Sequence, residues 1–164
     1  MNNNKMNILF VCLGNICRSP TAEGVFAKKI AAAGLSEKVH IDSCGTGSWH
    51  IGSPPDKRSQ KAAAQHGYDL SHLRARKFDS SDFQKFDYIL AMDARNLADV
   101  MQSVPHDFSG RLQLFLDYHG DTDLTEVPDP YHGDGDGFIR VISLVEKASD
   151  GLVEHLQAIM DETP

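Results

Sequence analysis

A cysteine and an arginine separated by five residues give the clearest chemical signal in the chain. Cys12 follows the apolar run Ile8-Leu9-Phe10-Val11, which predicts a buried strand, and Arg18 stands at the start of an amphipathic segment. The loop between them therefore wraps a helix N-terminus, where backbone N–H groups and the helix dipole supply partial positive charge. This field favours the thiolate form of Cys12, which is the nucleophilic form of a cysteine.

The residues between the cysteine and the arginine suit a phosphate site. Gly14 lets the backbone approach a ligand closely, and Asn15 tolerates a left-handed conformation better than most residues. Arg18 offers a planar fork that grips two oxygens of a phosphate-like dianion. A thiolate beneath a bound phosphoryl group is a nucleophile for phosphoryl transfer. The predicted substrate-binding loop comprises Leu13, Gly14, Asn15, Ile16, Cys17 and Ser19.

With Ser19-Pro20 directly after the arginine and Asp129-Pro130-Tyr131 far downstream, the chain resembles the low-molecular-weight protein tyrosine phosphatases over essentially its whole length. The resemblance implies hydrolysis of phosphotyrosine and aryl phosphates through a cysteinyl-phosphate intermediate, with no cofactor and no metal. In that scheme Cys12 is the nucleophile, Arg18 binds the phosphate and stabilises the transition state, and Asp129 is the general acid. The expected partner is a phosphotyrosine-containing protein, such as a tyrosine kinase.

Residue chemistry alone leaves two interpretations of Asp129 open. An aspartate before a proline is common in turns, and that explanation needs no catalysis. Alternatively, Pro130 restricts Asp129 to extended backbone geometry and fixes where its carboxyl points, so that it donates a proton as the P–O bond breaks. The family resemblance favours the general acid.

Three polar residues are candidates for supporting the loop. Ser19 either caps the helix or donates a hydrogen bond to the Cys12 thiolate, and the resemblance favours the second role. The resemblance also implies a hydrogen bond between Asn15 and Ser43. Plain turn chemistry for Asn15 and a half-buried strand position for Ser43 are the alternatives.

Two aromatic residues are expected at the substrate pocket. Trp49 lies in a glycine-rich polar loop, which argues against deep burial, and Tyr131 follows the Asp-Pro step. Both are predicted to form walls around an aryl phosphate by stacking on its ring, rather than to pack in the core.

Cys17 shares the loop with Cys12. We expect peroxide to drive a reversible Cys12–Cys17 disulfide that protects Cys12 from higher oxidation, and an inert packed thiol is the alternative.

The segment around His72 departs from the family's pattern. The family often has a His-x-Ala-Arg sequence here, with the histidine supporting the loop, but His72 stands one place too early relative to Arg76. The cluster Arg74-Ala75-Arg76-Lys77 is interpreted as a solvated face.

Strands and helices alternate along the whole chain. Besides the strand at 8–11, strands are predicted at 39–44, 88–92 and 112–116, helices at 20–33, 54–66, 94–104 and 138–160, and a long polar loop at 117–137. This order predicts one α/β domain over residues 1–164, with a parallel sheet and helices on both faces. The resemblance implies a four-stranded Rossmann-like sheet of the phosphotyrosine protein phosphatase I type.

The predicted strands also locate the site. In such folds ligands bind at the carboxyl ends of the strands. Cys12, Ser43, Asp93 and the loop of Asp129 all lie at or after strand ends, so they can converge there.

Charge and composition limit the classes of partner and the cellular compartment that we expect for this protein. The net charge of -7 argues against general nucleic-acid binding, which needs a basic face. The N-terminal apolar run is too short for a secretory or membrane-spanning segment. Three cysteines without disulfide-framework spacing suit a reducing compartment, so a cytoplasmic protein is expected.

Three other functions compete with a tyrosine phosphatase. An arsenate reductase of this fold would need two more downstream cysteines, and none follows Cys44. A non-catalytic phosphate-binding module predicts the loss of Cys12, Arg18 or Asp129, all of which are present. Arginine-phosphate phosphatases of this family tend to carry threonine where Ile16 stands, so Ile16 favours phosphotyrosine.

Overall fold

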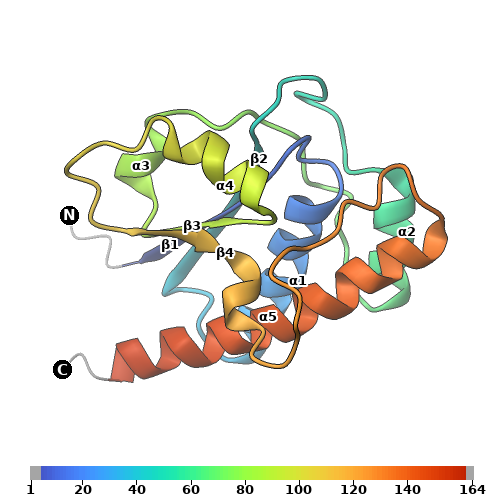
Figure 1. The fold of residues 1–164 in the computed structure, drawn as a ribbon. Coiled ribbons are helices and arrows are strands. Elements are labelled where there is room, and N and C mark those ends of the chain that lie inside the picture. The colour runs from blue at the N-terminus through green and yellow to red at the C-terminus, as the bar shows by residue number, and fades with distance from the viewer. Residues whose placement is uncertain (1–4, 162–164) are drawn as a thin grey trace.

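The structure is a computed structural model that describes residues 5–161 (Figure 1). Within that range four strands form one parallel sheet in the order β2-β1-β3-β4. The strands are β1 (Met6–Cys12), β2 (Val39–Gly45), β3 (Tyr88–Ala91) and β4 (Arg111–Leu114). The helices are α1 (Arg18–Ala32), α2 (Lys57–Gln65), α3 (Asp82–Lys85), α4 (Ala94–Met101), the 3-10 turn η1 (Phe115–Tyr118) and α5 (Gly135–Asp161). The predicted α/β fold with a four-stranded parallel sheet is confirmed.

Alternate residues of β1 pack into two different cores. Ile8, Phe10 and Cys12 belong to the larger core, which contains the buried faces of α1 and α5. Leu9 and Val11 belong to the smaller core on the opposite face, beside α3 and α4. Figure 1 shows these helix pairs on either side of the sheet. The strand periodicity of two therefore turns the side chain of Cys12 toward the α1 side.

Helix α1 begins at Arg18, immediately after the cysteine loop, which we define as residues 12–18. Pro20 fits the first turn, where a missing N–H group costs nothing. Gly34 lies just past the end with a φ of 74°, the left-handed conformation that commonly stops a helix. Because apolar residues of α1 pack in the larger core, the helix N-terminus is fixed relative to β1.

Several predicted boundaries were wrong by a few residues, including the start of α2, at Lys57 rather than 54, and the end of α4, at Met101 rather than 104. The strand expected at 112–116 ends at Leu114, because the chain turns into η1 and packs Phe115 against Phe10, with ring centroids 4.9 Å apart. The last helix begins at Gly135 rather than 138, since weak helix formers are tolerated in a first turn. Within that helix, Gly151 has a packing reason: a Cβ there would collide with the carbonyl oxygen of Tyr118.

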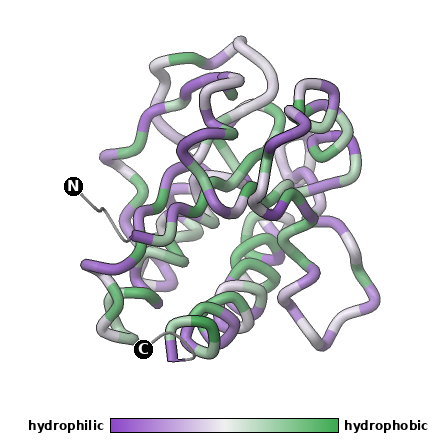
Figure 2. Tube along the Cα trace, turned by 90° about the vertical axis from the view of Figure 1, so that its left-hand side faces the viewer, coloured by the Kyte–Doolittle hydropathy of each residue, from purple (hydrophilic) through white to green (hydrophobic). Residues whose placement is uncertain are grey.

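In the described residues, no helix is long and apolar enough to cross a membrane. In Figure 2 the helical coils, including the longest one, α5, contain both hydrophilic and hydrophobic residues.

Candidate active site

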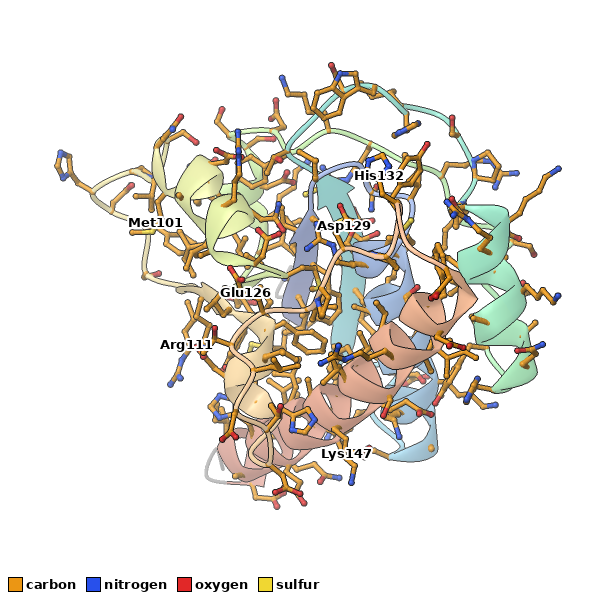
Figure 3. All side chains as sticks on the ribbon, turned by 45° about the vertical axis from the view of Figure 1, so that its right-hand side comes forward. Met101, Arg111, Glu126, Asp129, His132 and Lys147 are labelled. Carbon is orange, nitrogen blue, oxygen red and sulfur yellow. The ribbon has the colours of Figure 1, made fainter. Side chains whose placement is uncertain are left out.

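A pocket lies where most of the predicted site residues meet, while Asn15 and Ser19 are buried and do not line it. Cys12 and Arg18 line it from the cysteine loop, and Asp129 lines it from the loop that precedes α5. Figure 3 shows Asp129 and His132 on that loop. The remaining lining residues are Leu13, Gly14, Ile16, Cys17, Trp49, His50, Tyr131 and His132.

The sulfur of Cys12 is buried among hydrogen-bonding groups. Cys12 Sγ lies 3.0 Å from Ser19 Oγ and 3.3 Å from the backbone N of Asn15. The hydroxyl and the backbone N–H are both able to donate to the sulfur, which lies at the edge of the pocket.

Asn15 holds the shape of the cysteine loop. Its φ of 57° is left-handed, as the sequence suggested for this position. Its side-chain Nδ2 donates to Ser19 Oγ at 2.8 Å and to Ser43 Oγ at 2.9 Å, so the expected contact with Ser43 is present. Its Oδ1 accepts from the backbone N of Arg76 at 3.0 Å. Donor and acceptor ends of the side chain are both engaged, which fixes the loop in one conformation.

The segment after β2 supports the other side of this loop. Thr46 N donates to the carbonyl oxygen of Cys12 and Gly47 N to that of Leu13, both at 2.9 Å. A Cβ at Gly45 would lie 2.6 Å from the carbonyl oxygen of Leu13, so only glycine permits this approach.

Arg18 is buried and held by two acceptors. Its Nη1 donates to Asp93 Oδ2 at 2.7 Å and to the carbonyl oxygen of Val127 at 3.0 Å. Burial by itself would lower the pKa of Arg18, but the negative charges of Cys12, Asp93 and Asp129 outweigh it, and the pKa is raised. The guanidinium is therefore a permanent, fixed cation beside the pocket.

The Asp129 carboxylate lies near the Arg18 guanidinium and also accepts a hydrogen bond within its own turn. Its Oδ2 lies 3.8 Å from Arg18 Nη2, and its Oδ1 accepts a hydrogen bond from the backbone N of Tyr131 at 3.1 Å. The side chain is 44% exposed, so it remains accessible to a substrate. The turn interaction and the position over the pocket coexist in the same residue.

Aromatic rings form the rim of the pocket. Trp49 is 71% exposed and Tyr131 is 37% exposed, so neither ring packs in the core. The sequence reasoning missed two pocket residues, His50 and His132, whose rings lie 6.3 Å and 4.9 Å from the ring of Tyr131. Their only signal in the sequence is that each directly follows a predicted wall residue.

The interpretation of residues 74–77 as a solvated face is wrong for Ala75, which is buried in the larger core, and for Arg76. Its guanidinium pairs with Asp42 at 2.9 Å and with Asp82 at 3.0 Å, and Asp82 is 2% exposed. Arg76 also donates its backbone N–H to Asn15, so it connects the two carboxylates to the cysteine loop. His72 is exposed.

Two further titratable groups lie close to the site, Glu23 on α1 and Cys17 in the cysteine loop itself. Glu23 Oε1 accepts from Ser43 Oγ at 2.7 Å, and burial raises the pKa of Glu23 to about 7. Burial also raises the pKa of Cys17 to about 12, against a hydrogen bond from Ser59 that lowers it, so Cys17 is a neutral thiol near pH 7. Glu23 was not anticipated, because it lies on α1 and its partner Ser43 lies on β2, 20 residues away in the sequence.

Comparison with known proteins gives a consistent picture. The profile of the family described as low molecular weight phosphotyrosine protein phosphatase matches residues 7–161. A protein of that description from Schizosaccharomyces pombe is 46% identical over 134 residues, which are 81% of this chain and 85% of the relative. A crystal structure of a protein tyrosine phosphatase from Entamoeba histolytica, with Hepes in the active site, matches with a TM-score of 0.91 and 42% identity, covering 94% of this chain and 98% of the other. A crystal structure of a Drosophila arginine phosphatase matches with a TM-score of 0.87 and 31% identity, covering 93% and 98%.

Proposed function

Because the chain belongs to the low molecular weight phosphotyrosine protein phosphatase family, we propose that it hydrolyses phosphotyrosine in proteins, and aryl phosphates, through a cysteinyl-phosphate intermediate. The observation that carries this proposal is the convergence of Cys12, Arg18 and Asp129 on one pocket with an aromatic rim. Asp129 is far from Cys12 and Arg18 in the sequence, so a local turn does not account for its meeting with them.

In the first step the phosphate binds to the cysteine loop and to Arg18. The Cys12 thiolate attacks the phosphorus atom, an S–P bond forms and the P–O bond to the phenol breaks. Asp129, as the carboxylic acid, gives its proton to the departing phenol oxygen. The fixed cation of Arg18 stabilises the charge on the transferring phosphoryl group, which is where most of the rate enhancement in phosphoryl transfer arises.

In the second step water hydrolyses the phosphoenzyme. The Asp129 carboxylate takes a proton from the attacking water as the new P–O bond forms. The S–P bond then breaks, inorganic phosphate leaves, and the sulfur returns to the thiolate. Ser19 Oγ, at 3.0 Å from the sulfur, donates a hydrogen bond to that thiolate and makes it a better leaving group.

The rim supports an aryl substrate. Trp49 and Tyr131 offer ring faces on which a phenol ring stacks. Leu13 and Ile16 add apolar surface to the same pocket. A phosphoserine side chain is shorter and lacks an aromatic ring, so it leaves these contacts unmade.

The proposed setting is a reducing cytoplasm, since a thiolate nucleophile is lost on oxidation. There the single domain of residues 1–164 would act on phosphotyrosine-containing proteins, with a tyrosine kinase among them.

A turnover panel tests this function. Phosphotyrosine, phosphoserine and phosphoarginine peptides, and arsenate with a thiol reductant, are incubated with the protein without added metal. Fast release of phosphate from the phosphotyrosine peptide, with far slower release from the other two, is the expected result. Preferred turnover of phosphoarginine would place the chain with the arginine phosphatases, and reduction of arsenate would contradict the hydrolase.

A further inference from the structure

Arg58 joins the start of α2 to the loop that carries Asp129. Its Nη2 donates to the carbonyl oxygen of Tyr131 at 3.0 Å. The guanidinium also lies over two aromatic rings, 4.7 Å from the centroid of Phe138 and 5.5 Å from that of Tyr131. Figure 1 shows the loop before α5 passing close to the upper end of α2.

Two hydrogen bonds to the Asp56 carboxylate fix the position of this guanidinium. Arg58 Nε and Nη2 donate to its two carboxylate oxygens at 3.1 Å and 2.9 Å. The hydrogen bonds from Arg58 hold the pKa of Asp56 below its usual value, so the pair stays charged. The backbone N of Asp56 donates to the carbonyl oxygen of Ile16 at 2.8 Å. One chain of contacts therefore runs from the cysteine loop through Asp56 and Arg58 to Tyr131.

The peptide groups of Tyr131 connect Arg58 to Asp129. Arg58 holds the carbonyl oxygen of this residue, while its backbone N donates to Asp129 Oδ1 at 3.1 Å. On the other side of Asp129 the chain is anchored at Val127, whose carbonyl accepts from Arg18 and whose N donates to Met92. The backbone around Asp129 is therefore held by hydrogen bonds at two positions, Val127 two residues before it and Tyr131 two residues after it.

We infer that Arg58 is a positioning residue that holds the Asp129 carboxyl over the pocket by fixing the backbone of Tyr131. The inference rests on the proposed role of Asp129 as general acid. The Arg58 side chain is 47% exposed, so solvent weakens its ion pair with Asp56, and its main contribution is to orientation. Misplacing a catalytic group by about 1 Å costs up to about 100-fold in rate.

The test compares Arg58→Ala with Lys57→Ala, which removes the neighbouring exposed cation from the same helix turn. For phosphate esters of poorly acidic phenols, R58A should lower kcat/KM by about 10-fold or more. For esters of strongly acidic phenols, which leave without a proton, the loss should be small. Inhibition by inorganic phosphate should be unchanged, and K57A should resemble wild type throughout. Arg58→Lys retains the charge and one donor but not the fork, so it should show the same graded loss at smaller size.

A double variant decides how Arg58 acts. In an Asp129→Asn background, R58A should cause no further loss, because the group that Arg58 positions is already absent. A loss of equal size for all phenols, or a full additional loss in the D129N background, would overturn the inference. If R58A does not fold, as judged by thermal unfolding, the same comparisons are made with R58K.

The two proposals fail in different ways. If D129N alone lowers turnover equally for all phenols, Asp129 is not the general acid, and the inference on Arg58 falls with it. If D129N shows a graded loss while R58A and R58K do not, only the inference on Arg58 is refuted.

Discussion

The hydroxyl oxygen of Ser19 lies 3.0 Å from the sulfur of Cys12, at the N-terminal end of α1. Ser19 Oγ accepts from Asn15 Nδ2 at 2.8 Å, so its own proton has two acceptors within reach, the carbonyl oxygen of Cys44 at 3.3 Å and the closer sulfur of Cys12. In the proposed mechanism the Ser19 hydroxyl donates to the Cys12 sulfur as the phosphoenzyme is hydrolysed.

Replacing Ser19 should slow the second step of turnover more than the first. Hydrogen bonds to charged groups contribute about 1.5–3 kcal/mol, so Ser19→Ala should lower phosphoenzyme hydrolysis by about 10-fold to 100-fold. Stopped-flow measurement with p-nitrophenyl phosphate should show a clear burst of phenol followed by slow steady-state release. Ser43→Ala, which removes a hydroxyl one hydrogen bond further from the sulfur, should have the smaller effect. A steady-state rate equal to wild type in S19A would contradict this role.

Asp129→Asn separates the catalytic and the turn interpretations of that residue. Asparagine still accepts the hydrogen bond from Tyr131 N, so the turn survives while the acid is lost. Turnover of phosphotyrosine should fall by about 10²–10⁴, the range typical of positioned proton transfer. The loss should shrink as the phenol becomes more acidic, and the alkaline limb of the pH profile should disappear. Equal losses across a series of phenols with that limb unchanged would rule out the general acid.

Glu23 makes the stability of the protein depend on pH. Burial raises its pKa in the folded protein to about 7, from an ordinary value of 4.5, and the nearby Asp42 carboxylate adds to the rise while Arg76 opposes it. Between these values the folded protein binds more protons than the unfolded chain, so Glu23 lowers the free energy of unfolding as pH rises. Glu23→Gln can still accept from Ser43 but carries no charge. Relative to wild type, this variant should gain up to about 3 kcal/mol between about pH 4.5 and 7.

Urea unfolding of both proteins at a series of pH values measures that difference. A difference between E23Q and wild type that stays constant across this range would show that Glu23 is ionised normally in the folded protein.

Cys17 remains a candidate partner for Cys12 under oxidation. Both residues line the same pocket and both are free thiols. Since burial raises the pKa of Cys17 to about 12, peroxide should first convert Cys12 to the sulfenic acid. Attack by the Cys17 sulfur would then release water and form the disulfide, which a thiol reductant reverses. We expect Cys17→Ser to recover far less activity than wild type after peroxide and thiol treatment.

Mass spectrometry of the oxidised protein should show the linked peptides. Cys44→Ser is the control, because Cys44 is buried in the smaller core. If the Cys17 variant recovers as fully as wild type and no linked peptide forms, Cys17 is an inert packed thiol.

The fold was predictable because its signals are local. Each strand is a short apolar or alternating run, and breaks such as Gly34 and Pro105 separate a helix from the next strand. Parallel strands bring their carboxyl ends to one edge, so the meeting of Cys12 with Asp93 and Asp129 follows from topology once the strands are identified.

The supporting contacts were not predictable, since they depend on residues distant in sequence. In the sequence Arg76 is not distinguishable from the neighbouring surface cations. Only the fold places the Asp42 and Asp82 carboxylates beside it. Glu23 likewise has no unusual neighbour in its own helix, and only Ser43 from β2 makes it distinctive. Local patterns state which groups are present, but long-range contacts decide which of them are buried together.

The most direct test of the proposed mechanism is to identify the residue that carries the phosphate during turnover. The protein is mixed with excess aryl phosphate, quenched rapidly under denaturing conditions, digested and analysed by mass spectrometry. We expect phosphate on the peptide that contains Cys12. We also expect that Cys12→Ser shows neither phosphopeptide nor turnover, while still binding inorganic phosphate through the loop amides and Arg18. Phosphate on any other residue, or appreciable turnover by the contaminant-free C12S variant, would contradict the proposed mechanism.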